Sequence, residues 1–200
     1  MSAKERIESA LAAIARLTGE SGIAWVVGGS AGLMLRELPL SSDPGDLDIY
    51  VDESQMEPFC RLLMQYATDE PHVSETSMYR SVLCHLRMEG IEVEIVGGFV
   101  VNAIESRYEI EVQDALVPLS DASVWLAPGG VTLVPLAHEL LFNVLRGRAD
   151  RCRLIAGAVA ADLGRHGKAL GVLESRNTLS DEVRAETARW IAECGSGALT

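Results

Sequence analysis

The chain has 200 residues, of which 48% are hydrophobic and 23% charged, a composition typical of a folded globular protein. The formal net charge of -12 at pH 7 disfavours binding to extended duplex nucleic acid, because the phosphate backbone is also negative. The N-terminal residues carry charges of both signs, and no stretch approaches the ~18 apolar residues of a membrane span. We therefore expect a cytoplasmic protein that has no membrane partner.

The first half of the chain is expected to alternate helices and strands. Apolar residues at helical spacing predict a helix over residues 3–17. The apolar run from Ile23 to Val27 predicts a strand buried on both faces, and residues 31–38 should form a helix that ends before Pro39. The remaining predictions are strands at 47–51, 81–87 and 90–96, a helix at 57–66, and a further strand pair at 108–112 and 124–126.

The last third of the chain is expected to be helical. Apolar stripes begin at Leu136 and recur at residues 154–163 and 183–191, whereas three glycines make a helix near 168–174 short. The sequence therefore predicts an α+β protein, with a core over residues 1–115 and a mainly helical C-terminal region over residues 116–200. The four cysteines follow no metal-binding or disulfide spacing, which favours buried reduced thiols.

A Gly-Gly-Ser turn between a strand and a helix is the first candidate for chemistry. Gly28 and Gly29 would let the backbone approach a phosphate without a Cβ in the way, and Ser30 adds a hydroxyl donor. A Gly-Gly pair before a helix is more often only a tight turn. The turn by itself therefore does not establish a phosphate site.

Two carboxylate pairs on predicted strands are the second candidate. Asp46 and Asp48 are two residues apart and should share one face, as should Glu92 and Glu94 on a later strand. Mg²⁺ prefers oxygen ligands of this kind, together with substrate phosphates. Each pair alone is more often a solvated acidic face, but a phosphate turn, a metal pair and a further carboxylate are the parts needed for two-metal phosphoryl or nucleotidyl transfer.

The run Val26-Val27-Gly28-Gly29-Ser30-Ala31, followed after a helix by Asp46-Leu47-Asp48-Ile49, resembles the signature of the polymerase-beta-like nucleotidyltransferase superfamily. The chain is most similar to the small bacterial branch of antibiotic nucleotidyltransferases and AbiEii-type toxins. Pro135, Leu140 and the segment from Arg146 to Asp150 are similar to later motifs of that branch. The resemblance implies a nucleotidyltransferase-type mixed β-sheet flanked by helices, with a helical C-terminal part.

The resemblance also implies an activity. The enzyme would transfer a nucleoside monophosphate from an NTP such as ATP to a hydroxyl acceptor and release pyrophosphate. Asp46, Asp48 and Glu94 would be the catalytic and metal-binding residues, holding two Mg²⁺ ions, with Glu94 as general base. Gly28, Gly29 and Ser30 would bind the nucleotide. The acceptor stays open between a small cationic molecule, a tRNA end and a protein hydroxyl.

The sequence departs from the family pattern at two positions. The third carboxylate is usually Asp, whereas here it is Glu94, with Glu92 as an alternative. Asn143 stands where relatives often have a lysine, a role that Arg146 or Arg148 could fill. These departures favour the alternative function, a non-catalytic or degenerate nucleotide-binding protein of the same fold, such as a toxin-antitoxin component.

Other residues with chemical potential are expected to have structural roles. The histidines are predicted to be surface or packing residues, and Trp25 and Trp125 to pack in the core. Asp43 and Asp52 flank the acidic strand and are expected to be solvated, with Asp43 a possible partner of a metal ligand. The four histidines are His72, His85, His138 and His166.

Overall fold

In the computed structural model, which describes residues 1–126 and 129–196, helix α1 (Ala3–Thr18) begins at a capping box. The Glu5 N–H donates to the Ser2 hydroxyl at 3.2 Å, and the Ser2 N–H donates to the Glu5 carboxylate at 2.7 Å. Two donors that a helix start leaves without partners are thereby satisfied. The predicted helix over residues 3–17 is confirmed.

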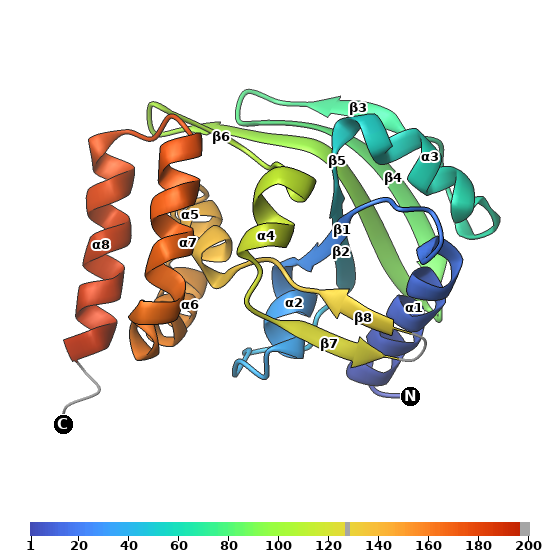
Figure 1. Cartoon of the computed structure of the whole chain (residues 1–200), viewed down its shortest axis with the longest axis horizontal. Coiled ribbons are helices and arrows are strands. Elements are labelled where there is room, and N and C mark those ends of the chain that lie inside the picture. Colours follow the sequence, from blue (N-terminus) through green and yellow to red (C-terminus); the bar gives the residue numbers. More distant parts are fainter. Residues whose placement is uncertain (127–128, 197–200) are drawn as a thin grey trace. The chain divides into compact units, whose positions relative to one another are not determined.

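A mixed sheet follows, in the strand order β1-β2-β5-β4-β3 (Figure 1). Strand β1 (Trp25–Gly28) pairs antiparallel with β2 (Asp46–Val51), and β2 pairs parallel with β5 (Ile91–Ala103). Strands β4 (Tyr79–Met88) and β3 (His72–Glu75) complete this order, and β6 (Ser106–Glu109) pairs with the end of β5. The sheet is therefore mixed, as predicted.

One face of the sheet forms a hydrophobic core with helices from the N-terminal half of the chain. Alternate residues of β2, β4 and β5 are buried on that face and pack with α1 and with helix α3 (Met56–Leu62). The alternation leaves the other residues of these strands on the opposite face. The buried set includes Leu47, Ile49, Leu86, Val93, Ile95, Ile7, Leu11, Ile14 and Phe59.

Short elements connect the larger ones. Helix α2 (Gly29–Leu35) follows β1, the 3₁₀ turns η1 (Glu53–Gln55) and η2 (Met64–Tyr66) flank α3, and a π-helical turn η3 (Val112–Leu116) leads into α4 (Val117–Leu119). Asp52 is not merely solvated, because its carboxylate accepts hydrogen bonds from the N–H groups of Val112 and Gln113 at 2.8 and 3.1 Å. Asp43 is exposed, as expected.

Two sequence predictions about strands and tryptophans are wrong. Strands do form at 124–126 and over part of 108–112, but they do not pair with each other, because β6 pairs with β5 and β7 (Ser123–Leu126) pairs with β8 (Gly129–Thr132). Trp125 lies on this small hairpin and is 79% exposed, whereas Trp25 packs against Phe59 at a ring separation of 6.2 Å. Strand β8 was not predicted, because it starts with two glycines and glycine is depleted in strands.

Four helices form most of the C-terminal third. They are α5 (Leu136–Leu145), α6 (Ala149–Ala161), α7 (Leu163–Arg176) and α8 (Asp181–Ser196). Helix α7 is longer than its three glycines predicted. Its buried residues, among them Ala169 and Leu173, keep it in place by packing, and tertiary packing outweighs the low helix propensity of glycine.

The described residues divide into two compact units that interleave along the chain. The first contains Met1–Thr76, Arg80–Phe99 and the described residues of Ile110–Val134, and the second contains Ser77–Tyr79, Val100–Glu109 and the described residues from Pro135 onward. This division differs from residues 1–115 and 116–200, which remain a prediction about domains. Cys60, Cys84 and Cys152 are buried free thiols, as expected, and Cys194 is partly exposed. No helix within the described ranges is long and apolar enough to cross a membrane.

The second unit contains a buried histidine that makes stability depend on pH. His138 is fully buried, lies 2.8 Å from the Tyr108 hydroxyl through Nδ1, and stacks on Phe142. Burial lowers the pKa of His138 to about 3. The unfolded chain, with a histidine pKa of about 6.5, therefore binds more protons than the folded chain below that pH. The stabilisation by the neutral ring is complete above about pH 6.5 and is lost as the pH falls toward 3.

We expect the free energy of unfolding to fall more steeply with acidification in the wild type than in His138→Gln. The difference should reach about 2 kcal/mol between pH 7.5 and 4.5, since each pH unit contributes up to about 1.4 kcal/mol. Urea unfolding of both proteins at the two pH values measures it. His72→Gln, at an exposed position, is the control. Equal losses in the wild type and His138→Gln would contradict the assignment of this dependence to His138.

Candidate functional site

Four carboxylates lie on one face of the sheet, on two neighbouring parallel strands. Asp46 of β2 is in register with Glu92 of β5, and Asp48 is in register with Glu94. The intervening residues, such as Leu47, are buried on the opposite face. Parallel pairing therefore brings the Asp-x-Asp segment of β2 beside the Glu-x-Glu segment of β5, although the two are more than 40 residues apart in sequence. The shared face that the alternation predicted for each pair is confirmed.

The Gly-Gly-Ser turn lies beside this face. Gly28 pairs with Asp48 in the β1–β2 register, and α2 begins at Gly29. Gly29 has a φ of 61°, in the left-handed region, and a Cβ built there would be 2.0 Å from Asp48 Oδ2. The position favours glycine, because a side chain would displace the Asp48 carboxylate and would strain the left-handed backbone. The predicted nucleotide-binding turn and the predicted metal pair are therefore adjacent.

Glu94 is the more buried of the two glutamates, since Glu92 is exposed. Burial raises the pKa of Glu94 above its ordinary value, and the carboxylates of Asp46 and Glu92 raise it further, while His85 lowers it. Gathered negative charges of this kind are costly unless a cation neutralises them. The pKa of Glu94 is thus set by its burial and by the charged groups around it.

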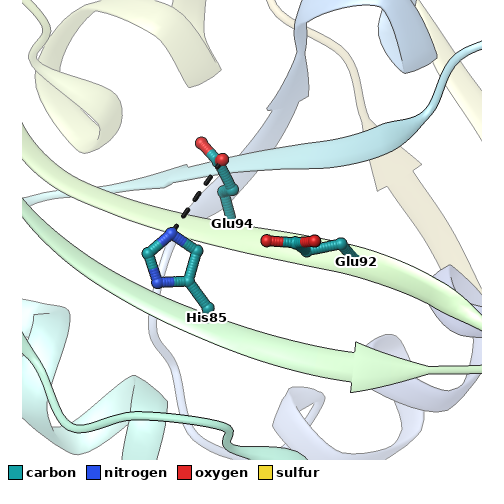
Figure 2. A group of neighbouring side chains, drawn as sticks. All are labelled: His85, Glu92 and Glu94. Atoms are coloured by element: carbon teal, nitrogen blue, oxygen red, sulfur yellow. Dashed lines mark ion pairs between the residues drawn. The ribbon is translucent and has the colours of Figure 1, made fainter.

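His85 also belongs to this region, although the sequence predicted a surface or packing role for it. It lies on β4, with Cys84 and Leu86 of the same strand pointing into the core. Its Nε2 is 4.0 Å from Glu94 Oε1 (Figure 2). The period-two alternation of the predicted strand 81–87 could have indicated on which face of the strand His85 lies. The sequence did not indicate that β4 neighbours β5.

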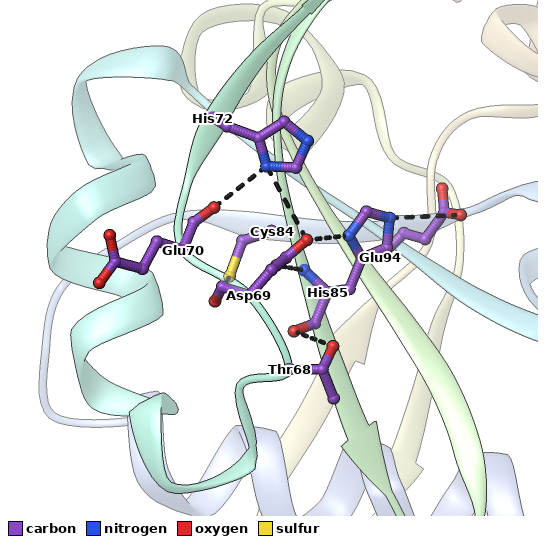
Figure 3. Close-up of polar contacts among 7 residues, drawn as sticks. All are labelled: Thr68, Asp69, Glu70, His72, Cys84, His85 and Glu94. Carbon is purple, nitrogen blue, oxygen red and sulfur yellow. Dashed lines mark hydrogen bonds and ion pairs between the residues drawn. The ribbon is translucent and has the colours of Figure 1, made fainter.

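Asp69 holds His85 in place. One carboxylate oxygen of Asp69 accepts from the His85 backbone N–H at 2.6 Å, and the other lies 2.5 Å from His85 Nδ1 (Figure 3). The hydrogen bond to Asp69 raises the pKa of His85. Partial burial opposes ionisation of Asp69, but its hydrogen bonds to His85 hold the pKa of Asp69 below its ordinary value. The ring therefore has a fixed orientation with Nε2 toward β5.

Asn143, which stands where related chains often have a lysine, belongs to the second unit. The two arginines that could replace that lysine, Arg146 and Arg148, belong to the same unit. Asn143 is buried and donates through Nδ2 to the Glu139 carbonyl at 2.8 Å. The Arg146 guanidinium lies over the Phe142 ring at 4.9 Å, and Arg148 pairs with Asp150 at 3.7 Å. Asn143 thus has a helix-internal partner, and both arginines have partners within their own unit.

The donor set on the carboxylate face fits divalent metal ions. Oxygen atoms of carboxylates are the ligands that Mg²⁺ takes in proteins, and a cation there would offset the repulsion that contributes to the raised pKa of Glu94. The aspartate and glutamate pairs lie on rigid strands of a sheet, which favours a defined position for their oxygens.

Two solved structures have a similar fold. A protein of Thermotoga maritima that is assigned as a nucleotidyltransferase shares 22% identity, with 70% of this chain and 84% of that chain covered and a TM-score of 0.56. The antibiotic-resistance factor ANT(2'')-Ia shares 14% identity, with 84% of this chain and 91% of that chain covered and a TM-score of 0.50. No family model matches the sequence, and no curated protein sequence matches it. The likeness shows that the chain has the nucleotidyltransferase fold, as its motifs predicted.

Proposed function

We propose that the protein is a metal-dependent nucleotidyltransferase that transfers a nucleoside monophosphate from an NTP to a hydroxyl acceptor. The observation that carries the proposal is the register of Asp46 with Glu92 and of Asp48 with Glu94, directly beside a glycine turn that leaves no room for a side chain. A two-metal nucleotidyl transfer needs convergent carboxylates and a place for the triphosphate, and the carboxylate face with its neighbouring turn would supply both.

The metal-binding residues of the proposed site are Asp46, Asp48 and Glu94, which would hold two Mg²⁺ ions. Glu94 is preferred over Glu92 because it is half-buried and its pKa responds to Asp46, whereas Glu92 is exposed. The bound metal would supply neutralisation of the charge that develops on the α-phosphate and the pyrophosphate leaving group.

The nucleotide-binding residues of the proposed site are Gly28, Gly29 and Ser30. The backbone of Gly29 runs close to Asp48, so phosphate oxygens at the turn would lie near the carboxylate face. Backbone N–H groups and a serine hydroxyl are hydrogen-bond donors, the kind of group that would bind the β- and γ-phosphates.

Glu94 is also the proposed general base. A carboxylate that lies beside the acceptor hydroxyl could take up its proton during the transfer. In the reaction the acceptor oxygen would form a bond to the α-phosphorus, the bond from that phosphorus to the pyrophosphate oxygen would break, and the hydroxyl proton would pass to Glu94. Pyrophosphate would leave with the electron pair of the broken bond.

The acceptor is proposed only as a class. The net charge of -12 suits a small cationic acceptor. An antibiotic-resistance factor has a similar fold, and antibiotics are small molecules. A tRNA end or a protein hydroxyl remains compatible with the same chemistry. A cytoplasmic location is part of the proposal, since NTP is the donor.

Calorimetric titration of the wild-type protein with each of the four nucleoside triphosphates, with and without Mg²⁺, tests the proposal. We expect at least one triphosphate to bind, and its dissociation constant to rise about tenfold or more when EDTA replaces Mg²⁺, because the carboxylates then repel the phosphates. Triphosphate binding with the same affinity in the presence and absence of Mg²⁺ would support a degenerate nucleotide-binding protein instead. If no triphosphate binds to the folded protein, the fold serves another purpose and the proposal fails.

A further inference from the structure

A nitrogen ligand faces the carboxylates of β5. The ligand atoms of His85, Glu92 and Glu94 all lie within 4.8 Å of one another, and the pair His85 Nε2 and Glu94 Oε1 is 4.0 Å apart (Figure 2). Two atoms bound to one ion at about 2.1 Å each lie about 3.0–3.4 Å apart at octahedral or tetrahedral angles. His85 and Glu94 would therefore need to approach each other by about 1 Å or less, and the exposed side chain of Glu92 can rotate toward them.

The surroundings of His85 match those of a metal-binding histidine. Metal-bound imidazoles usually donate their second N–H to a carboxylate, which fixes the ring and the tautomer. Asp69 is placed for this role, since it holds both Nδ1 and the backbone N–H of His85. The Thr68 N–H and hydroxyl donate to the His85 carbonyl at 2.8 and 3.1 Å, so the backbone is held as well (Figure 3). With Nδ1 donating, the lone pair of Nε2 is directed toward Glu94.

We propose that His85, Glu92 and Glu94 bind one divalent transition-metal ion, and that this position prefers Mn²⁺, Co²⁺ or Zn²⁺ to Mg²⁺. The preference follows from the donor set, because imidazole nitrogen suits these metals whereas Mg²⁺ takes oxygen ligands in a strict octahedral geometry. The inference rests on the proposed function for the shared role of Glu94, and it adds a metal selectivity that three carboxylates alone would not produce. The metal-free alternative is an ion pair between a protonated His85 and Glu94.

Metal titrations in the absence of nucleotide, combined with pulsed EPR of the Mn²⁺-loaded protein, separate these alternatives. The wild type should bind Mn²⁺ and Zn²⁺ about tenfold or more tightly than Mg²⁺. Bound Mn²⁺ should show the ¹⁴N coupling of an imidazole ligand. In His85→Gln the ¹⁴N coupling should disappear and the affinity for Mn²⁺ and Zn²⁺ should fall about tenfold or more, with Mg²⁺ affinity little changed.

His72→Gln is the matched control, because His72 is a neighbouring histidine whose ring is 6.1 Å from that of His85 and which also faces Asp69. It should keep the ¹⁴N coupling and the metal preference of the wild type. The proposal is overturned if Mn²⁺ binds without ¹⁴N coupling, if no metal binds, if the coupling depends on His72, or if His85→Gln leaves the ratio of Mn²⁺ to Mg²⁺ affinity unchanged. Triphosphate titrations stay separate: metal binding through His85 without any triphosphate binding would refute the proposed function and not this site.

Discussion

Asp46→Asn/Asp48→Asn is expected to weaken Mg²⁺-dependent triphosphate binding by about a thousandfold, which corresponds to about 4 kcal/mol. Both carboxylates lie on the face beside the glycine turn, and asparagine keeps their shape while removing the charge that holds a divalent cation. Calorimetry with the triphosphate that binds the wild type most tightly measures the effect.

The free energy of unfolding of the same double variant should be equal to or higher than that of the wild type. Two of four gathered carboxylates become neutral, so repulsion on the face decreases while the packing of β2 is unchanged. Asp43→Asn, at an exposed position in the preceding turn, serves as the control for charge and should bind like the wild type. Undiminished metal-dependent binding by the folded double variant would remove Asp46 and Asp48 from the proposed site.

Gly29→Ala is expected to weaken triphosphate binding about a hundredfold, or about 2.7 kcal/mol, and to lower the free energy of unfolding by about 1–2 kcal/mol. The new Cβ would lie 2.0 Å from Asp48 Oδ2, so the aspartate must rotate away from its position. A φ of 61° adds backbone strain for any residue with a side chain. Calorimetry and urea unfolding measure the two effects.

Gly45→Ala is the matched control, because a Cβ there meets no atom within 4 Å and Gly45 is not among the glycines with positive φ. It should bind triphosphate like the wild type and be as stable or slightly more stable, since alanine reduces the entropy of the unfolded chain. If Gly29→Ala binds like Gly45→Ala, the close approach of the turn to Asp48 has no functional importance.

Much of the first part of the fold could be read from local patterns. The apolar stripe of α1, the buried run of β1 and the alternation in β2 and β5 depend on spacing along the chain, and spacing determines which residues share a face. The motif of Gly28, Gly29 and Ser30 followed by Asp46 and Asp48 indicated the fold through its resemblance to the nucleotidyltransferase signature. Pattern alone could not assign strand partners, so the pairing predicted for 108–112 and 124–126 was wrong.

Helix α7 shows where local propensity misleads. Three glycines argued for a short helix, but the helix extends over Leu163–Arg176 because burial of one side compensates for glycine's conformational entropy. Trp125 shows the opposite error, since a large aromatic residue was expected in the core and lies exposed on a small hairpin.

The sequence by itself determined the nature of the groups in the candidate site: two carboxylate pairs, each confined to one face of its strand by the period of two, and a glycine turn before a helix. Only the tertiary structure decided that the pairs meet, because the parallel register of β2 with β5 is a contact between segments distant in the chain. It alone brought His85 and Asp69 to Glu94, since strand order and the path of the segment before β3 depend on packing of the whole sheet rather than on local spacing.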